Sequence, residues 1–425
     1  MADQTIGSAR VGDSDIELTR MAKFLVWASM VSVLFVNQIA YNIGQFPAAL
    51  DLPCYALITA YLLASGYAKV SMPILQLFVA VIAMAAFRIP LLPTTTQASW
   101  SSLVLLAAGY ASFAVRLSPR SGLSAIQQYI LDAYVTTACI IAAVGTIQIV
   151  AVNATRLKEL QNIYFVLPEA IRGAGTYVFA REAGGGLAKA NGYFLRESAE
   201  LSSVTALAFL AEYFDKRRPF RLFVLAMGLA ASISGSGVIA LAAGFLLPKS
   251  VGRIPIALAT ACGAMLLLYA LYSLDNPVLN LWFGRLTEFG TPGSSAYARF
   301  VAPWEMVQRT FNDGIAATWF GNGPGSFFRM LAEFRSRYEI SDPTWAKLIY
   351  EYGLAGFIFV TLIVIIRLYS SSLRVELCNF MLFSWLVFPS VLKPTTFLIM
   401  WLVTLAPARR NAPPPRHSPM VQRSV

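Results

Sequence analysis

Long apolar stretches alternate with polar connections along most of the chain. A helix that crosses a bilayer needs about 20 predominantly apolar residues, and stretches of this kind recur from the first fifty residues to the last thirty. The pattern predicts spans at residues 21–43, 52–68, 73–92, 99–115, 127–151, 199–214, 254–273, 345–368, 377–390 and 394–407. We therefore expect an all-α polytopic membrane protein with about 11 to 12 transmembrane helices.

One further apolar run, residues 222–247, is interrupted by Ser234-Gly235-Ser236-Gly237. Basic residues flank it, with Lys216-Arg217-Arg218 before it and Lys249 and Arg253 after it. Because cations in short connections favour the cytoplasmic side, the run is expected to form two short helices that turn at the Ser-Gly segment. A single tilted span is the alternative, and it would invert the orientation of everything that follows.

The same rule predicts cytoplasmic termini and two large loops on the periplasmic face. The first apolar stretch has no small-residue cleavage site, so we interpret it as a retained span. The expected segments are a cytoplasmic leader (1–20), an N-terminal bundle (21–151), a first periplasmic loop (152–198), helices with the broken hairpin (199–273), a second periplasmic loop with the active site (274–344), C-terminal helices (345–407) and a basic cytoplasmic tail (408–425).

Composition supports a membrane protein: 57% of the 425 residues are hydrophobic, 13% are charged and the mean hydropathy is +0.61. The net charge of +11 follows from the topology and the loops, so it does not indicate a nucleic-acid partner. The single histidine is His417, in the tail, and the four cysteines lie inside apolar stretches. We therefore expect neither a disulfide framework nor a bound metal or cofactor.

Arginine outnumbers lysine in the two large loops. A guanidinium binds phosphate oxygens through two parallel hydrogen bonds, so this preference indicates an anion site. Arg299, Arg172 and Arg329 are the candidates. The alternative for any single arginine is a solvated surface, or, for Arg299, an ion pair with a nearby acid such as Glu305.

Several short motifs within residues 190–360 occur in a characteristic order. They are Asn191-Gly192-Tyr193-Phe194-Leu195-Arg196-Glu197-Ser198, Ser234-Gly235-Ser236-Gly237, Arg299-Phe300 followed by Trp304, Gly321-Asn322-Gly323-Pro324-Gly325-Ser326-Phe327, Asp342-Pro343-Thr344-Trp345 and Glu351-Tyr352-Gly353-Leu354-Ala355-Gly356. Together they resemble the signature of the O-antigen ligase and Wzy-like polysaccharide polymerase superfamily. That resemblance implies a GT-C-like helical membrane glycosyltransferase.

Three departures from the family pattern refine this resemblance. Asp342 stands where many ligases have a histidine, Gly237 replaces an arginine, and Ser198 replaces a proline. Loss of the histidine disfavours a lipid-A core ligase. The resemblance therefore favours a polymerase of repeat units, of an exopolysaccharide of the xanthan type, with the core ligase as the alternative.

The resemblance implies transfer between two undecaprenyl-pyrophosphate-linked oligosaccharides, in which a growing glycan joins a hydroxyl of a new repeat unit. Arg299 would stabilise the leaving pyrophosphate, with Arg172 and Arg329 as weaker candidates. A carboxylate would take the hydroxyl proton, and Asp342 is preferred because it occupies the position of the ligase histidine. Glu197 and Glu351 are the other carboxylates, although Asp342 and Glu197 could equally cap helices.

The remaining candidates would bind substrate. Gly321, Gly323 and Gly325 could present backbone amides to a phosphate, and Trp304 could stack on a sugar. A flexible turn and a headgroup anchor are the respective alternatives. The expected partners are the lipid bilayer, a chain-length regulator and a flippase. A lipid-linked oligosaccharide flippase is the alternative function from a different class, but it would place ionisable residues near the middle of spans.

Overall fold

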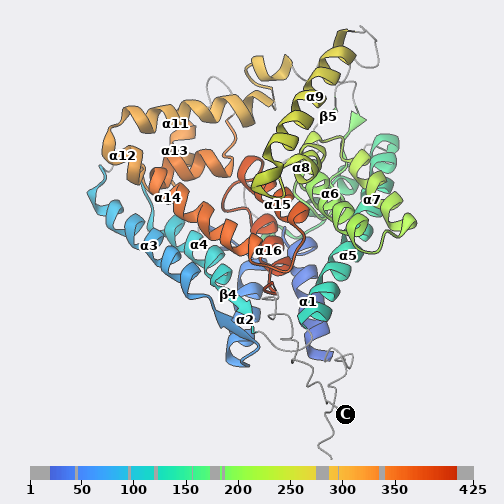
Figure 1. Ribbon diagram of the computed structural model, residues 1–425, viewed down its shortest axis with the longest axis horizontal. Helices are drawn as coiled ribbons and strands as arrows, with labels where there is room; N and C mark the ends of the chain where they lie inside the picture. Colours follow the sequence, from blue (N-terminus) through green and yellow to red (C-terminus); the bar gives the residue numbers. More distant parts are fainter. Residues whose placement is uncertain are drawn as a thin grey trace, which may run out of the picture.

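The computed structural model describes residues 20–43, 46–93, 97–118, 123–155, 157–172, 182–183, 187–273, 287–294, 296–334 and 340–408. The expected leader up to residue 19 and the tail beyond residue 408 lie outside these residues. Within them the chain is mostly helical, with 15 α-helices (Figure 1). Their bounds are α1 Arg20–Leu34, α2 Asp51–Ala64, α3 Met72–Arg88, α4 Trp100–Tyr110, α5 Leu123–Thr155, α6 Ser198–Phe214, α7 Pro219–Ala231, α8 Gly235–Leu246, α9 Ile254–Ser273, α11 Ala302–Asn312, α12 Ile315–Phe320, α13 Ser326–Phe334, α14 Thr344–Tyr369, α15 Val375–Val387 and α16 Pro394–Val403.

Three helical stretches among the described residues are long and apolar enough to cross a membrane: Met72–Leu91, Ala125–Thr155 and Thr344–Tyr369. Shorter apolar helical stretches lie at Asp51–Ala64, Trp100–Ala114, Pro219–Ala231, Gly235–Leu246, Val375–Val387 and Pro394–Val403. The expectation of a helical membrane protein is thus confirmed. The number of spans and their orientation stay predictions.

The all-α expectation needs a correction, because the described residues also form three two-stranded antiparallel sheets. The predicted span 21–43 ends as a helix at Leu34, and the chain continues into a hairpin of β1 (Ala40–Ile43) and β2 (Phe46–Ala49). Asn37 and Gln38 lie in the segment between α1 and β1 and are buried, and each side chain donates a hydrogen bond to a distant segment. Satisfying these buried polar groups favours an irregular segment over another helical turn.

The other two sheets lie in segments for which the sequence predicts no strand. One forms at the ends of two predicted spans, and the other forms within the first large loop. β3 (Ala68–Val70) pairs with β4 (Val115–Leu117), so the ends of two predicted spans form strands. β5 (Glu182–Ala183) pairs with β6 (Leu187–Ala188) in the first large loop. That loop also contains the short 3₁₀ turns Lys158–Leu160, Ile163–Phe165 and Glu169–Ile171.

The interrupted run at residues 222–247 forms two helices, α7 and α8. α7 ends with Ser232 at its C-cap, and α8 begins with Ser234 at its N-cap. Gly237 fits closely against α6, since a Cβ there would lie 2.2 Å from the Ser202 carbonyl oxygen. Only glycine allows two backbones to approach this closely, which accounts for the small residues at the break.

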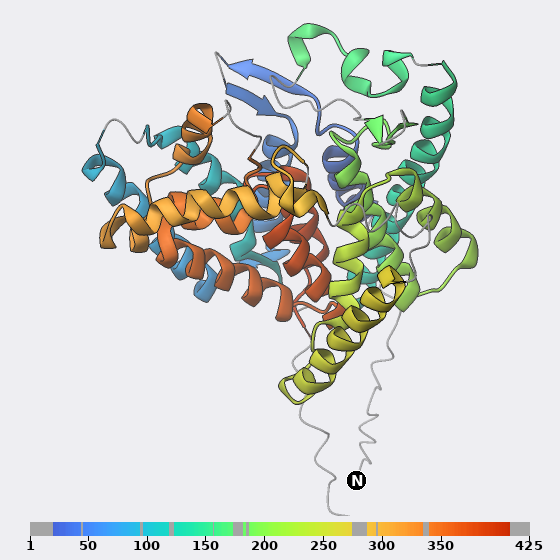
Figure 2. The same ribbon diagram turned by 90° about the horizontal axis from the view of Figure 1, so that it is seen from above.

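Helix α6 packs against α5, α7 and α8, and α8 also packs against α15. A second group of contacts joins α14 to α3, α11, α12 and α15. α16 lies at the centre of the molecule between these groups and contacts α1, α4 and α5 (Figure 1). Viewed from above, α11 crosses over α14, whereas α9 projects away from the bundle (Figure 2).

Arg367 of α14 is fully buried and bonds to carbonyl and hydroxyl oxygens. Its Nη1 donates to the carbonyls of Phe113 and Val115 at 3.1 and 2.6 Å, and its Nε donates to Thr404 Oγ1 at 2.9 Å. Nη2 reaches the Trp401 carbonyl at 3.3 Å. The side chain therefore joins α14 to the segment after α4 and to α16.

Replacing Arg367 with methionine is expected to lower the free energy of unfolding by about 3 kcal/mol or more, because several buried carbonyls lose their donor at once. Thermal unfolding of the protein in detergent measures the change. Arg217→Met is the matched control, because the side chain of this exposed arginine donates to the Tyr213 carbonyl one turn away and stacks on the Tyr213 ring. Equal melting temperatures for the two variants would contradict the assigned role of Arg367.

Candidate active site

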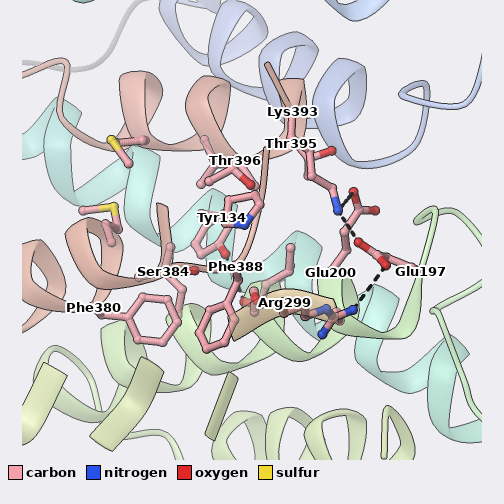
Figure 3. Close-up of a pocket in the computed structure, with 18 residues that line it drawn as sticks. Tyr134, Glu197, Glu200, Arg299, Phe380, Ser384, Phe388, Lys393, Thr395 and Thr396 are labelled. Atoms are coloured by element: carbon pink, nitrogen blue, oxygen red, sulfur yellow. Dashed lines mark hydrogen bonds and ion pairs between the residues drawn. The ribbon is translucent and has the colours of Figure 1, made fainter. Parts of the chain in front are cut away.

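An open pocket of about 670 Å³ lies where α6 begins, α15 ends and α16 begins. This volume includes space open to solvent. Charged side chains gather at one end of the pocket and aromatic and aliphatic side chains line the other (Figure 3). The charged end holds Glu197, Glu200, Arg299 and Lys393, and Phe380 and Phe388 lie at the apolar end. The lining also includes Tyr134, Leu207, Met381, Thr395, Thr396 and Met400.

Two carboxylates enter the pocket from the start of α6. Glu197 is the N-cap residue and has extended backbone, but its side chain makes no capping hydrogen bond. Glu200 lies in the first turn, three residues later, so both side chains project from the same face. The positive end of the helix dipole stabilises negative charge here. The local sequence therefore holds two acids side by side at a helix start.

Lys393 supplies a cation opposite these acids. It is the N-cap residue of α16, and Pro394 follows at the first helical position. Its Nζ lies 2.5 Å from Glu197 Oε1 and 3.0 Å from Glu200 Oε1. Burial by itself lowers the pKa of Lys393, but the two carboxylates outweigh it, so the pKa lies above its ordinary value. Lys393 therefore carries a full positive charge at neutral pH.

Arg299 provides the second cation, from a different part of the chain. It lies on the π-helical segment Tyr297–Val301, a geometry often found at functional sites. Its Nη2 is 3.8 Å from Glu197 Oε2, and about a quarter of the side chain is exposed. Glu305 is the partner that the local sequence suggests, and the ion pair observed here joins Arg299 to Glu197, 102 residues away in sequence.

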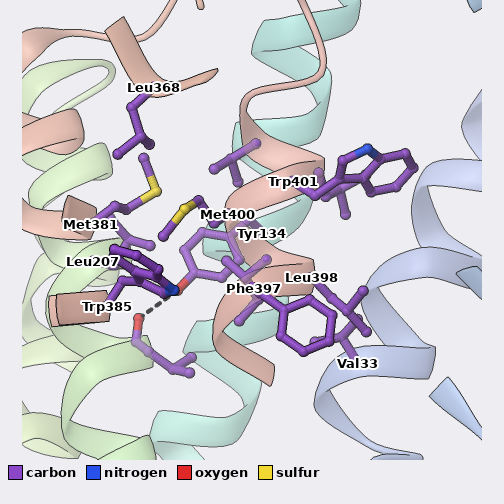
Figure 4. Packing of buried hydrophobic residues seen from close by; sticks show 14 of the residues in the cluster. Val33, Tyr134, Leu207, Leu368, Met381, Trp385, Phe397, Leu398, Met400 and Trp401 are labelled. Atoms are coloured by element: carbon purple, nitrogen blue, oxygen red, sulfur yellow. Dashed lines mark hydrogen bonds between the residues drawn. The ribbon is translucent and has the colours of Figure 1, made fainter. Parts of the chain in front are cut away.

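The other end of the pocket is apolar and continues into the hydrophobic core. Phe380, Ser384 and Phe388 of the α15 segment face the cavity (Figure 3). Behind them, Tyr134, Leu207, Met381 and Met400 belong both to the pocket wall and to the main buried cluster (Figure 4). The Tyr134 hydroxyl donates to the Val204 carbonyl at 3.0 Å, so the one polar atom of that ring is satisfied. The pocket thus joins a charged end to an apolar wall that is part of the hydrophobic core.

Asp342, the preferred base in the sequence analysis, does not line this pocket. Its Oδ2 accepts a hydrogen bond from Lys347 Nζ at 3.0 Å. Lys347 is almost fully buried, and its ammonium also reaches Ser390 Oγ at 3.3 Å and lies over the Phe328 ring. Asp342 therefore neutralises a buried lysine beside the segment that follows α15.

The glycine motif and Glu351 contact one another. The amides of Asn322 and Gly323 donate to the carbonyls of Tyr350 and Glu351 at 2.8 and 2.9 Å. The Phe327 amide donates to Glu351 Oε1 at 3.3 Å. The turn that was expected to donate backbone amides to a phosphate thus donates one of them to the carboxylate of Glu351.

Gly321 and Gly353 lie where the glycine motif crosses α14, and each faces main-chain atoms of the other segment. Both have backbone angles that glycine alone adopts readily, φ 75 and ψ −177 for Gly321 and φ 68 and ψ −176 for Gly353. A Cβ at Gly353 would lie 2.3 Å from the Trp319 carbonyl carbon, and one at Gly321 would lie 2.4 Å from the Glu351 carbonyl. Gly325 is similarly close to Ser102. Gly321 and Gly353 therefore allow α12 to lie against α14, Gly325 allows a close approach to α4, and Gly353 interrupts the helical backbone of α14.

The other predicted residues lie outside the pocket lining. Arg172 Nε donates to the Leu167 carbonyl at 2.6 Å, and the guanidinium stacks on Tyr164. Arg329 donates to the Gln97 carbonyl. Trp304 is half exposed on α11, with its ring centroid 6.1 Å from that of Trp345. Among the predicted site residues, the structure therefore brings Glu197 and Arg299 together in the pocket, and Glu351 together with Gly321 and Gly323 at a separate crossing.

Lys393 and Glu200 escaped the sequence analysis. The sequence places Lys393 in the short connection between the predicted spans 377–390 and 394–407, where it reads as part of a turn. One signal was present: the predicted topology places that short connection on the periplasmic face, where cations are disfavoured. A lysine in such a place indicates a role that outweighs the positive-inside preference.

Comparisons with known proteins leave the chain without an assigned family. It matches no protein-family model, and no curated protein sequence matches it. The functional argument therefore rests on the geometry of the pocket and on the motifs of the sequence.

Proposed function

We propose that this protein is a bacterial inner-membrane polysaccharide polymerase. It would join oligosaccharide repeat units linked to undecaprenyl pyrophosphate, on the periplasmic face, and release undecaprenyl pyrophosphate. The proposal includes a GT-C-like fold of about 11 to 12 spans with both termini in the cytoplasm, as the charge pattern predicts. It is supported by the motif order described above.

One observation supports the proposal most strongly: Glu197 lies between Arg299 and Lys393 at the charged end of a pocket whose other end is apolar. A lipid-linked donor has an anionic pyrophosphate next to an apolar chain. The two cations would bind the oxygens of the pyrophosphate. The aromatic wall would contact the first part of the apolar lipid chain. A carboxylate in the same place suits a reaction in which a hydroxyl loses its proton.

The proposed transfer is a displacement at the anomeric carbon of the donor glycan. The oxygen of the acceptor hydroxyl forms a bond to that carbon, and the bond from the carbon to the phosphate oxygen breaks. The electron pair of the broken bond stays on the pyrophosphate, where Arg299 and Lys393 stabilise the added negative charge. The hydroxyl proton passes to the Glu197 carboxylate and then to water. In this scheme two cations of the protein stabilise the leaving pyrophosphate, and one carboxylate of the protein accepts the proton of the acceptor.

Arg299→Ala is expected to lower the rate of glycan extension by about 10²–10³-fold, the usual cost of removing one group that stabilises developing charge. Purified protein in proteoliposomes would receive the lipid-pyrophosphate-linked oligosaccharide, and the glycan ladder would be followed over time. Arg299→Lys should keep part of the activity, because it keeps the charge but loses the planar fork. Arg217→Ala, far from the pocket lining, serves as the control. A wild-type rate in Arg299→Ala would contradict the assignment.

The acceptor distinguishes a polymerase from a ligase. A polymerase extends glycans that remain on lipid pyrophosphate, whereas a ligase moves them to a lipid-A core. Asp342 replaces the ligase histidine and is held by the buried Lys347. We therefore expect extension when the second repeat unit is offered and no transfer when the lipid-A core is offered.

A further inference from the structure

The two cations of the pocket are already occupied before any substrate binds. Glu197 is within ion-pair distance of both, at 2.5 Å from Lys393 and 3.8 Å from Arg299. A carboxylate held by two cations is a weak base. The pyrophosphate of the proposed donor needs the same two cations. The proposed reaction therefore requires Glu197 to give up these contacts.

The two carboxylates differ in how firmly they are held. Glu200 is buried, and its Oε2 accepts the backbone amide of Arg196 at 2.7 Å while its Oε1 faces Lys393. Glu197 makes no capping bond to α6, and its side chain, which lines the pocket, is 28% exposed. The pair with Arg299 is also the longest of the three contacts. Lys393 lies closer to Glu197 than to Glu200, but Glu197 is the more exposed carboxylate, so it is the one that an incoming pyrophosphate can reach and displace.

We propose that donor binding exchanges the partners of Lys393 and Arg299, so that pyrophosphate oxygens replace the Glu197 carboxylate and free it to act as the base. This inference rests on the proposed function. Lys393 touches the pyrophosphate in this scheme, and Glu200 is a positioning residue that keeps Lys393 at the pocket. The exchange is favourable because pyrophosphate has more negative charge and more acceptor oxygens than one carboxylate. It makes the base available only when the donor is in place.

The exchange makes an unusual prediction about binding. Glu197→Gln removes the competitor for both cations and a negative charge beside the ligand, so it should bind undecaprenyl pyrophosphate about tenfold more tightly than wild type. Lys393→Met should bind it at least tenfold more weakly, and Lys393→Arg should recover part of the loss. Binding would be measured by titrating undecaprenyl pyrophosphate into purified protein in detergent, with undecaprenol as the uncharged reference. Two charge-matched controls outside the pocket lining, Asp215→Asn and Lys216→Met, should bind as wild type does.

The role of Glu200 needs a kinetic readout, because loss of a buried acid could simply weaken the fold. Glu200→Gln should raise the donor KM several-fold and leave the acceptor KM unchanged. A purely structural role would lower the amount of folded enzyme and move neither KM.

The outcomes separate the two proposals. If wild type binds undecaprenyl pyrophosphate no better than undecaprenol and builds no glycan, the proposed function fails. If wild type binds the pyrophosphate and extends glycans, but Glu197→Gln binds equally or more weakly, the exchange alone is overturned. An unchanged donor KM in Glu200→Gln overturns the positioning role.

Discussion

Replacing Glu197 with glutamine is expected to stop glycan extension, with a rate loss of about 10²–10⁴-fold, the usual contribution of a general base. Glutamine has nearly the same size but cannot accept a proton at neutral pH. The fold should persist, because the Glu197 side chain does not cap α6 and lies partly exposed in an open pocket. Initial rates of ladder formation, divided by the amount of folded protein, measure the effect.

Asp342→Asn is the informative comparison for Glu197→Gln, since the sequence alone favours Asp342 as the base. The structure pairs Asp342 with the buried Lys347 instead, so this variant should lose stability and keep its rate per folded molecule within a few-fold. The opposite pattern, an inactive Asp342→Asn and an active Glu197→Gln, would return the base to Asp342.

The second large effect is expected at the crossing of the glycine motif and α14. Gly353→Ala should lower the free energy of unfolding by about 4 kcal/mol or more, because it combines a strained backbone with a collision against main-chain atoms. The added Cβ would meet the Trp319 carbonyl carbon at 2.3 Å and the Phe320 amide at 2.4 Å. Neither backbone can move away without breaking the contact of α12 with α14. We expect little folded protein in detergent, measured by size-exclusion chromatography and thermal unfolding.

Gly263→Ala provides the control for Gly353→Ala. Gly263 lies within α9, and a Cβ there would meet no atom within 4 Å. Because alanine has the higher helix propensity, this variant should be as stable as wild type or slightly more stable. A Gly353→Ala protein that melts together with Gly263→Ala would show that the crossing tolerates a side chain.

The sequence predicts the membrane character and most helices because a span is a local pattern of composition. It does not predict the strands of β1 and β2, since hairpins this short have little periodicity and depend on distant partners. Asn37 illustrates this: its position inside an apolar run gives no hint that it reaches Thr395. Gly353 also lies inside a predicted span, and its backbone conformation depends on the contact with Trp319.

The sequence indicates several residues of the site, but it does not indicate which residues form ion pairs or hydrogen bonds with them. Arg299 and Glu197 were named from motifs, and the structure places them in one pocket. Glu351 was also named, but its partner is the turn of Phe327, a pairing that requires two chain segments to cross. Lys393 could have been suspected from topology alone, whereas its two carboxylate partners follow only from the fold, which brings the starts of α6 and α16 to the same pocket.

Glycan extension by the purified protein is the most direct test of the proposed function. Proteoliposomes that contain only the wild-type protein would receive a lipid-pyrophosphate-linked oligosaccharide, and both new glycosidic bonds and released lipid pyrophosphate would be counted. The account predicts one lipid pyrophosphate released for each new bond, with the products still attached to lipid pyrophosphate. Movement of the lipid-linked oligosaccharide across the bilayer without any new bond would contradict it and indicate a transporter.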